Sequence, residues 1–303
     1  MILRLRPLGR SFLLCEVTPM THQENERLLD LISQYLTFTP EAISPEDVSA
    51  LTADGLTPDE AYLALLAARI GLDTAKPADA LLYRRYLPRM VRRHDPAVYE
   101  ADAYFQAVKP IVGQQGSIDL VYETIGPMEL FVADDFTVDR DGFALPQLGW
   151  FDRTFAFPAI REDGLVWMTV TPNEINTIQP AVRESHGRVL TYGLGLGYYA
   201  FHCLLKAEVE SVTVVEKNPA VIDMFRRHLL PFFPRQDALT IIQADAFDYA
   251  ERVMPHEGFD TVFTDLWHDV ADGIPLYRRM KALEAPGPKY LYWIEKTLQV
   301  YMD

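Results

Sequence analysis

Cysteine and long apolar runs are both scarce in this chain of 303 residues. Its two cysteines, Cys15 and Cys203, lie far apart without C-x-x-C spacing, and they predict neither a disulfide framework nor a zinc site. No stretch of about 18 apolar residues occurs, so we expect no membrane-spanning helix and a reducing, cytoplasmic location. The start, MILRLRPLGRSFLLCEV, lacks the apolar core and cleavage site of a signal peptide, and we interpret it as an N-terminal strand or extended arm.

Positive charge is also in short supply. The chain has 28 Lys and Arg against 43 Asp and Glu, a net charge of −15. Because nucleic-acid affinity comes mainly from Lys and Arg that neutralise phosphates, we expect no nucleic-acid partner, and a small or cationic substrate fits better. The arginine-rich segment 84–93 could bind a phosphate or an acidic partner, but it is also typical of a solvated helical face. The histidines lack ligand spacing, so no metal site is expected at His186, His202 or His228.

Residues 1–115 predict a helical N-terminal domain. Thr21 and Glu24 have the spacing of a capping box, which marks a helix start. Three further starts place an N-cap residue before a proline at the first helical position, where the missing N–H costs nothing: Ser44-Pro45, Thr57-Pro58 and Asp95-Pro96. With 49% hydrophobic residues the chain can bury one large core or two modest ones, and we expect more than one domain.

Residues 116–170 change to short β-like runs, which predict a β-hairpin region. The runs are IDLVYET, MELFVADDFTV, RTFAFPAI and LVWMTV, separated by turn dipeptides such as Asp141-Gly142. A second capping box, Thr171 with Glu174, opens the helix that follows. The hairpins therefore stand directly before the next domain, where they could serve as a lid or as a platform for a substrate.

Residues 171–303 carry four ordered signals of an α/β domain: RVLTYGLGLG, VTVVEKNP, IIQADAFDY and FDTVFTDLWHD. Each is an apolar, β-branched run that ends in a glycine or a carboxylate and precedes a stretch that can be helical, as in successive βα units. The strands predicted from these runs are 189–192, 212–215, 239–243 and 261–264. Ligands of such domains bind along the carboxyl edge of the sheet.

The first signal ends in a glycine loop with the pattern G-x-G-x-G: Gly193, Leu194, Gly195 and Gly197. A dinucleotide fingerprint would place its third glycine at position 198, which is a tyrosine here. Glycines at these positions allow a sharp turn and bring backbone N–H groups and a helix N-terminus close to a ligand. We expect this loop to bind a cofactor.

The second and third signals end in carboxylates suited to an adenosine. Glu216 stands 19 residues after the last loop glycine, close to the spacing of about 20 expected for a carboxylate that binds ribose hydroxyls. Asp245 and the backbone N–H of Ala246 could pair with the donor and acceptor on an adenine edge.

The fourth signal ends at Asp265, which we expect to face the reacting end of the ligand. Trp267, His268 and Asp269 follow it. An aromatic wall and a titratable imidazole could position and deprotonate a nucleophile. Asp265 and His268 are therefore the catalytic candidates, and Trp267 and Asp269 are candidates for substrate binding.

Together these residues resemble the S-adenosylmethionine-dependent methyltransferases of the Rossmann-like class, over roughly residues 172–270. The resemblance implies that the glycine loop lines the methionine and ribose parts of S-adenosylmethionine and that Glu216 holds the ribose. It further implies that Asp245 and Ala246 meet the adenine, and that Asp265 borders the substrate. The implied activity is methyl transfer to a small or moderately sized acceptor.

The chain is also similar to spermidine synthase, the aminopropyltransferase branch of this fold. GLVWMTVTPNEINTIQPAV leads into the glycine loop as a hairpin and helix do there, VESVTVVEKNPAVIDMF resembles that branch too, and Asp265 matches its catalytic aspartate. That branch carries a loop aspartate for the ligand's amine, whereas this loop has Leu194 and Leu196 between its glycines, and DLWHD lacks the branch's D-S-x-D-P run. Aminopropyl transfer from the decarboxylated cofactor is therefore the second hypothesis.

Only 34 residues follow Asp269. The resemblance implies three more strands after the fourth, so we expect a Rossmann-like methyltransferase domain with a shortened C-terminal sheet. A shortened sheet keeps a third hypothesis open, a non-catalytic S-adenosylmethionine-binding protein. Its exposed edge would be covered in a homodimer.

Overall fold

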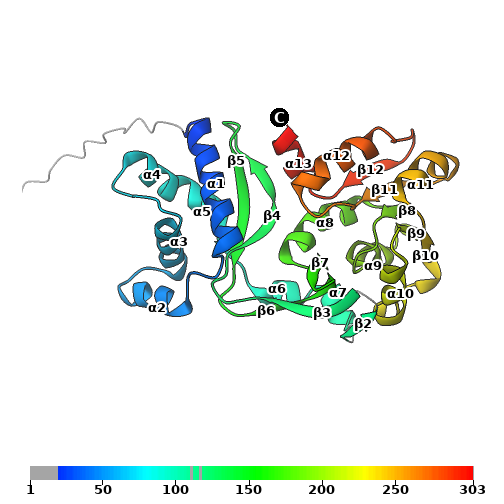
Figure 1. Cartoon of the computed structure of the whole chain (residues 1–303), viewed down its shortest axis with the longest axis horizontal. Helices are drawn as coiled ribbons and strands as arrows, with labels where there is room; N and C mark the ends of the chain where they lie inside the picture. The colour runs from blue at the N-terminus through cyan, green and yellow to red at the C-terminus, as the bar shows by residue number, and fades with distance from the viewer. Residues whose placement is uncertain (1–19, 110–111, 116–117, 303) are drawn as a thin grey trace, which may run out of the picture.

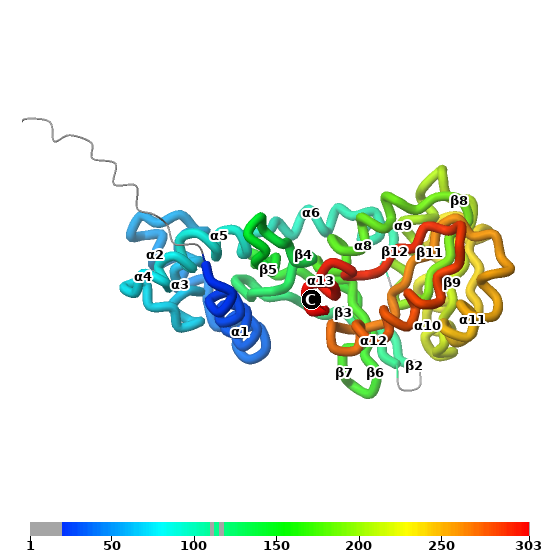
Figure 2. Tube along the Cα trace, turned by 90° about the horizontal axis from the view of Figure 1, so that it is seen from above, coloured from blue at the N-terminus to red at the C-terminus, as the bar shows by residue number. Residues whose placement is uncertain are grey.

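The computed structural model describes residues 20–109, 112–115 and 118–302. The arm predicted at the start of the chain lies outside them. The molecule is elongated, with the first five helices at one end and a parallel sheet at the other (Figure 1). Seen from above, the β4–β5 hairpin and the C-terminal helix lie between these two ends (Figure 2).

The N-terminal body packs helices on a three-stranded sheet. The helices are α1 (His22–Phe38), α2 (Pro45–Ala53), α3 (Pro58–Arg69), α4 (Pro77–Leu81), a π-helical turn (Leu82–Tyr86) and α5 (Leu87–Met90). The strands are β1 (Val91–Arg93), β5 (Ala144–Trp150) and β4 (Phe131–Val138), in the order β1-β5-β4. The predicted helix starts at Thr21, Ser44 and Thr57 are confirmed, and each side chain closes a capping box.

The predicted hairpin region divides between two sheets. Its β4–β5 hairpin shares the apolar core of the N-terminal body, for example through Leu148 and Trp150. The other strands form an antiparallel sheet beside the parallel one, in the order β2 (Gly113–Gln115), β3 (Ile118–Ile125), β6 (Phe155–Glu162) and β7 (Leu165–Thr169). The short helices α6 (Pro96–Glu100) and α7 (Ala103–Ala107) link the two bodies.

The C-terminal body is the predicted Rossmann-like domain. Five parallel strands run in the order β10 (Leu239–Gln243), β9 (Val209–Glu216), β8 (Gly187–Tyr192), β11 (Thr261–Thr264) and β12 (Lys289–Tyr292). Its helices are α8 (Pro172–Glu184), α9 (Tyr198–Leu205), α10 (Pro219–His228), α11 (Ala246–Arg252), α12 (Val270–Lys281) and α13 (Glu295–Met302). The four predicted strands are all present. Apolar side chains on both faces bury β8 and β11, as a helix-covered parallel sheet requires.

The sheet is short at its C-terminal edge, as predicted. Within the described residues a single strand, β12, follows β11. The chain then forms α13, which packs against β4, where the N–H of Thr297 donates to the Asp135 carboxylate at 3.0 Å. Asn176 of α8 also donates to the carbonyl of Ala133 at 2.8 Å. The β4–β5 hairpin is thus fastened to the C-terminal body.

No helix in the described ranges is both long and apolar enough to cross a membrane.

Candidate functional site

A cavity of about 790 Å³ opens at the carboxyl edge of the parallel sheet. It lies where β8 and β11 are neighbours although β9 follows β8 in the chain, which is the topological switch point of the sheet. Its walls come from the loops after β8, β9, β11 and β12, from the start of α8, and from β7 of the antiparallel sheet. The hairpin β6–β7 therefore borders the cavity, as the lid or platform interpretation requires.

The three loop glycines each have positive φ but for different physical reasons. A Cβ at Gly193 (φ 99°) would lie 2.1 Å from the carbonyl oxygen of Asp265, so glycine lets the ends of β8 and β11 approach. A Cβ at Gly197 (φ 77°) would lie 2.6 Å from the ring of Phe225. A Cβ at Gly195 (φ 50°) meets only the sulfur of Met168, at 3.8 Å, and Gly195 lines the cavity. The absence of a side chain at Gly195 therefore leaves space in the cavity, whereas at Gly193 and Gly197 it prevents a clash within the protein.

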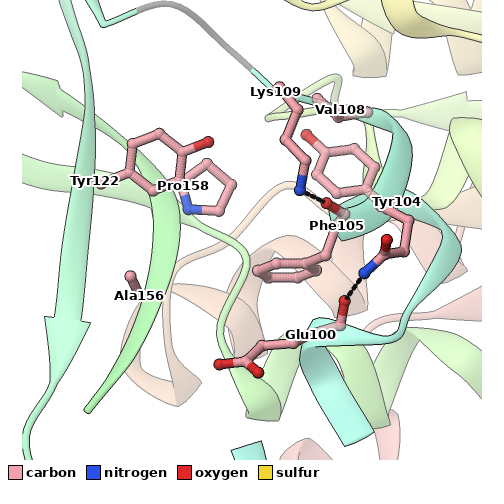
Figure 3. Close-up of a pocket in the computed structure, with 9 residues that line it drawn as sticks. Glu100, Tyr104, Phe105, Val108, Lys109, Tyr122, Ala156 and Pro158 are labelled. Carbon is pink, nitrogen blue, oxygen red and sulfur yellow. Dashed lines mark hydrogen bonds between the residues drawn. The ribbon is translucent and has the colours of Figure 1, made fainter. Parts of the chain in front are cut away.

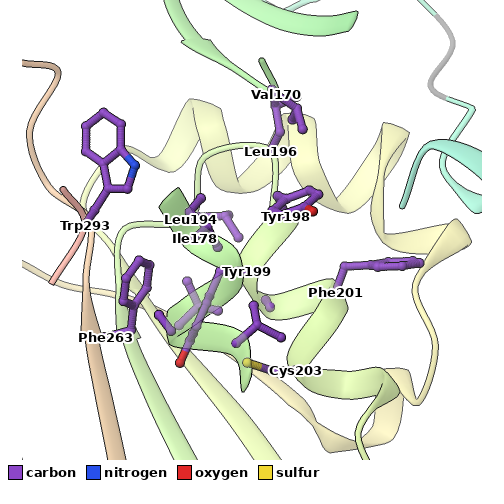
Figure 4. Packing of buried hydrophobic residues seen from close by; sticks show 14 of the residues in the cluster. Val170, Ile178, Leu194, Leu196, Tyr198, Tyr199, Phe201, Cys203, Phe263 and Trp293 are labelled. Atoms are coloured by element: carbon purple, nitrogen blue, oxygen red, sulfur yellow. The ribbon is translucent and has the colours of Figure 1, made fainter. Parts of the chain in front are cut away.

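The loop rests on a buried apolar layer. Leu194 and Leu196 are buried members of the large apolar cluster, and Figure 4 shows Leu194 beside Ile178 and Leu196 beside Val170. Tyr199 stacks on Phe263 with ring centroids 4.2 Å apart. The two leucines thus anchor the loop in the apolar core.

Glu216, predicted to bind ribose, is buried at the end of β9 and lines the cavity. One carboxylate oxygen accepts from the N–H of Leu194 at 3.1 Å, and the other accepts from the N–H of Asn218 at 2.7 Å. Each oxygen can accept further hydrogen bonds, so the carboxylate braces the loop and still has capacity for a ligand.

Two backbone donors of the loop have no partner among the residues that the structure describes. Within the described part of the chain, no group accepts a hydrogen bond from the N–H of Gly195 or Leu196. The first turn of α9 follows directly, and the N–H groups of a helix's first turn have no partner inside the helix. An anionic or acceptor group of a ligand would satisfy them.

Two carboxyl groups at the cavity have raised pKa values. Burial raises the pKa of Asp265 to about 7, and the nearby His268 opposes this shift. Burial raises the pKa of Glu174 to about 8, although Thr169 and the N–H of Thr171 donate to it at 2.8 and 3.1 Å, and the charge of Asp265 adds to the increase. Two neighbouring carboxyls that titrate near neutrality in one cavity are typical of a site that binds or moves protons.

Glu174 is the residue that the sequence interpretation left out of the site. Its position three residues after Thr171 predicted a capping box, and that box is present. The same carboxyl lines the cavity, because the first turn of α8 points toward the end of β11. The sequence signal for this role is a capping-box glutamate at the start of the helix that leads into the strand before the glycine loop.

The residues after Asp265 divide into two groups. Trp267 is buried, lines the cavity and lies parallel to Tyr292 at 6.5 Å between ring centroids. His268 lies at the cavity rim, where its Nδ1 is 2.9 Å from Asp272 and its ring is 4.3 Å from the ring of Trp167. Asp269 caps α12 and does not line the cavity.

Asp245 and Ala246 lie beside the cavity rather than on its lining. Asp245 caps α11 by accepting from the N–H groups of Phe247 and Asp248 at 2.9 and 3.2 Å. Its second oxygen is 3.6 Å from the amine of Lys217, which does line the cavity. A contact of Asp245 and Ala246 with an adenine edge stays a prediction.

The lining is aromatic and acidic. Three of the four tryptophans contribute to it: Trp167, Trp267 and Trp293. The carboxyl groups of Glu174, Glu216 and Asp265 line the cavity, and the exposed Lys217 is the only Lys or Arg on the lining among the described residues. This composition favours a ligand that carries positive charge and flat or apolar groups.

Comparisons with known proteins give only weak, partial structural matches. No protein-family model matches the sequence, and no curated protein matches it significantly. Among solved structures, precorrin 8w decarboxylase of Methanobacterium thermoautotrophicum matches with a TM-score of 0.30 at 17% identity, over 41% of this chain and 63% of that one. Spermidine synthase from Thermotoga maritima matches with a TM-score of 0.29 at 17% identity, over 40% and 44%. The chain spans less than two thirds of either structure.

Proposed function

We propose that this protein binds S-adenosylmethionine in the cavity and transfers the methyl group to a small acceptor. The observation that carries the proposal is that Glu216 and the glycine loop meet at one wall of the cavity, at the switch point of the parallel sheet. This is where a Rossmann-like sheet receives an adenosine, with a carboxylate at the ribose.

The residues present suit this ligand. The bare Cα of Gly195 leaves space that a side chain would fill, and the N–H groups of Gly195 and Leu196 suit a carboxylate. The cavity volume of about 790 Å³ lies within the range of roughly 300–1,000 Å³ that is usual for ligand sites, and it leaves room for an acceptor. The acidic and aromatic lining suits a positively charged sulfonium.

When bound, S-adenosylmethionine supplies a methyl group on a positively charged sulfur. The chain's own task is to align the acceptor with that group and to exclude water. The Asp265 carboxyl, titrating near neutrality, can take the proton that an amine or hydroxyl acceptor loses. Because the lining is acidic, we expect a small amine as the acceptor.

Aminopropyl transfer is the second candidate, and Glu174 is the observation that favours it. The loop lacks the aspartate that would pair with an aminopropyl amine, but the carboxyl of Glu174 lines the same cavity from α8. A nearby ammonium group would favour the ionised form of this carboxyl and pair with it. This arrangement would favour the decarboxylated cofactor, which has an amine and no carboxylate.

Calorimetric titration tests the proposal. We expect S-adenosylmethionine and S-adenosylhomocysteine to bind wild-type protein and to lose at least tenfold in affinity for Glu216→Ala. Preference for the decarboxylated cofactor, with release of methylthioadenosine in the presence of a polyamine, would establish the second candidate instead. Release of S-adenosylhomocysteine in the presence of an amine would establish methyl transfer. If the folded wild type binds none of these compounds, the proposal is wrong.

Asp265→Asn provides the catalytic arm of this test. The amide keeps the shape of the side chain but cannot take a proton, so we expect binding of S-adenosylhomocysteine to persist while turnover falls by about 10²–10⁴-fold. Turnover at the wild-type rate by the variant would show that Asp265 is not the catalytic base.

A further inference from the structure

The second half of the glycine loop is held by a residue of the N-terminal region. The hydroxyl of Tyr104, in α7, donates to the carbonyl of Leu196 at 2.8 Å, and the Tyr104 side chain is fully buried. Leu196 stands between Gly195 and Gly197 and lines the cavity. A tyrosine from a linking helix therefore fixes a peptide of the loop 92 residues later in the chain.

Asp102, the N-cap of α7, holds the start of α9 in the same way. Its carboxylate accepts from the hydroxyl of Tyr198 at 3.0 Å and lies 3.0 Å from Nε2 of His202. The N–H of Tyr104 donates to it at 2.8 Å, which joins the two contacts into one unit. The side chains of Asp102 and His202 are only 13% and 11% exposed, so water competes little for these bonds.

Helix α7, which carries Tyr104 and Asp102, is itself held by hydrogen bonds and packing. The amide of Gln106 donates to the carbonyl of Glu100 at 2.6 Å, and the amine of Lys109 donates to the carbonyl of Phe105, which closes both ends of α7 (Figure 3). The ring of Tyr104 packs edge-on against Phe201 at 5.3 Å between centroids. The segment belongs to the large core of the C-terminal body and not to that of the N-terminal helices.

The loop thus has two anchors, which belong to two different elements. Glu216 holds the N–H of Leu194 from β9, and Tyr104 holds the carbonyl of Leu196 from α7. Between them lies Gly195, whose N–H has no partner among the described residues. Binding is tighter when donors are already fixed in the bound geometry, because less conformational entropy is lost.

We propose that Tyr104 and Asp102 are positioning residues of the ligand site, which hold the glycine loop in its binding conformation from outside the parallel sheet. The inference rests on the proposed adenosyl ligand. It assigns the N-terminal region an indirect role in ligand binding. Helix α7 holds the glycine loop in position, although neither Tyr104 nor Asp102 lines the cavity.

Tyr104→Phe tests this proposal with a matched control. The change removes one buried hydroxyl and leaves the Leu196 carbonyl unpaired. Tyr62→Phe removes an equivalent buried hydroxyl, which donates to the carbonyl of Met128 at 3.1 Å in the core of the N-terminal body. Both variants should lose similar thermal stability. We expect only Tyr104→Phe to weaken S-adenosylhomocysteine binding, by about tenfold, and to speed hydrogen exchange of the ligand-free loop peptide 193–198.

The outcomes separate the two proposals. Equal ligand affinity and equal loop exchange in both variants would overturn the positioning role. If wild-type protein does not bind S-adenosylhomocysteine, the proposed function fails, and loop exchange alone decides the inference. Should Tyr104→Phe not fold, Asp102→Asn provides the same readouts, since it keeps the side-chain volume and loses the charge that faces His202.

Discussion

The carboxylate of Glu216 accepts a hydrogen bond from the backbone N–H of Leu194 at 3.1 Å, across 22 residues of sequence. The acidic residue at the end of β9 therefore sets the shape of the loop after β8 before any ligand binds. A ribose hydroxyl would add a contact to a carboxylate whose position is already fixed by the N–H of Asn218 as well. Loop geometry and ligand affinity should respond together to changes at Glu216.

Glu216→Gln should lower both stability and ligand affinity. The amide keeps one acceptor oxygen but replaces the other by an NH₂ group that faces a backbone donor. We expect a loss of about 1–3 kcal/mol of unfolding free energy and at least a tenfold weaker binding of S-adenosylhomocysteine. Denaturant unfolding and calorimetry measure the two quantities.

Asp139→Asn is the matched control for this variant. The side chain of Asp139 is buried in the N-terminal body: its Oδ1 accepts from the N–H groups of Asp141 and Phe143 at 2.9 and 3.1 Å, and its Oδ2 accepts from Arg89 at 3.2 Å. It should lose comparable stability with unchanged ligand affinity. Equal affinity losses in the two variants would mean that Glu216 acts through global stability alone.

Gly195 and Gly197 should separate binding from folding. Gly195→Ala meets only the sulfur of Met168 at 3.8 Å, so its cost is the left-handed conformation, about 1–2 kcal/mol, and the protein should fold but bind poorly. Gly197→Ala forces the rings of Phe225 and Phe233 to move from 2.6 and 2.7 Å, so we expect about 2–5 kcal/mol of destabilisation. Thermal unfolding and calorimetry on both variants check this, and tight binding by Gly195→Ala would count against the loop assignment.

The sequence predicted the β-strands of the Rossmann-like domain well, because each is a short apolar run with a carboxylate or glycine at its end. The strands β10 and β11 have the predicted bounds, 239–243 and 261–264. The pairing of the strands in the hairpin region could not be predicted from the sequence. The sequences of β4 and β6 do not show which sheet each strand joins, because that depends on pairing far along the chain.

The site residues, too, could be predicted only where local sequence determines their role. An N-cap aspartate and a ligand-binding carboxylate occupy the same place after a β-strand, so spacing alone could not separate Asp269, which caps α12, from Asp265, which faces the cavity. The sequence did not predict that Glu174 belongs to the site, because the capping box alone accounts for a glutamate at this position. Its second role depends on how α8 docks beside β11, which no local pattern records.

The stability of the ligand-free protein should fall as pH rises from about 5 to 8. Glu174 and Asp265 have pKa values of about 8 and 7 in the folded protein, above their ordinary values, so the folded state binds protons that the unfolded state has released. These two carboxyl groups therefore contribute less stability as pH rises through this window. Glu174→Gln, which can still form the capping box, should raise Tm at pH 8 by about 3 °C and leave it nearly unchanged at pH 5.

Glu60→Gln is the control for the pH experiment. Glu60 occupies the same capping-box position in α3, but it is exposed and its hydrogen bonds with Thr57 lower its pKa. Its removal should not raise Tm at pH 8. A rise in both variants would show that the effect belongs to the helix terminus and not to the cavity.

Trp167 should report occupation of the cavity. Its side chain is 42% exposed on β7, lines the cavity and touches the ring of His268, whereas Trp150 is buried in the other core. A ligand that fills the cavity removes water from Trp167, so its fluorescence emission should shift to shorter wavelength on addition of S-adenosylhomocysteine. Trp167→Phe should lose most of this shift while calorimetry still detects binding. A shift of unchanged size in the variant would have to come from Trp267 or Trp293, which also line the cavity, and would remove the β6–β7 hairpin from the site.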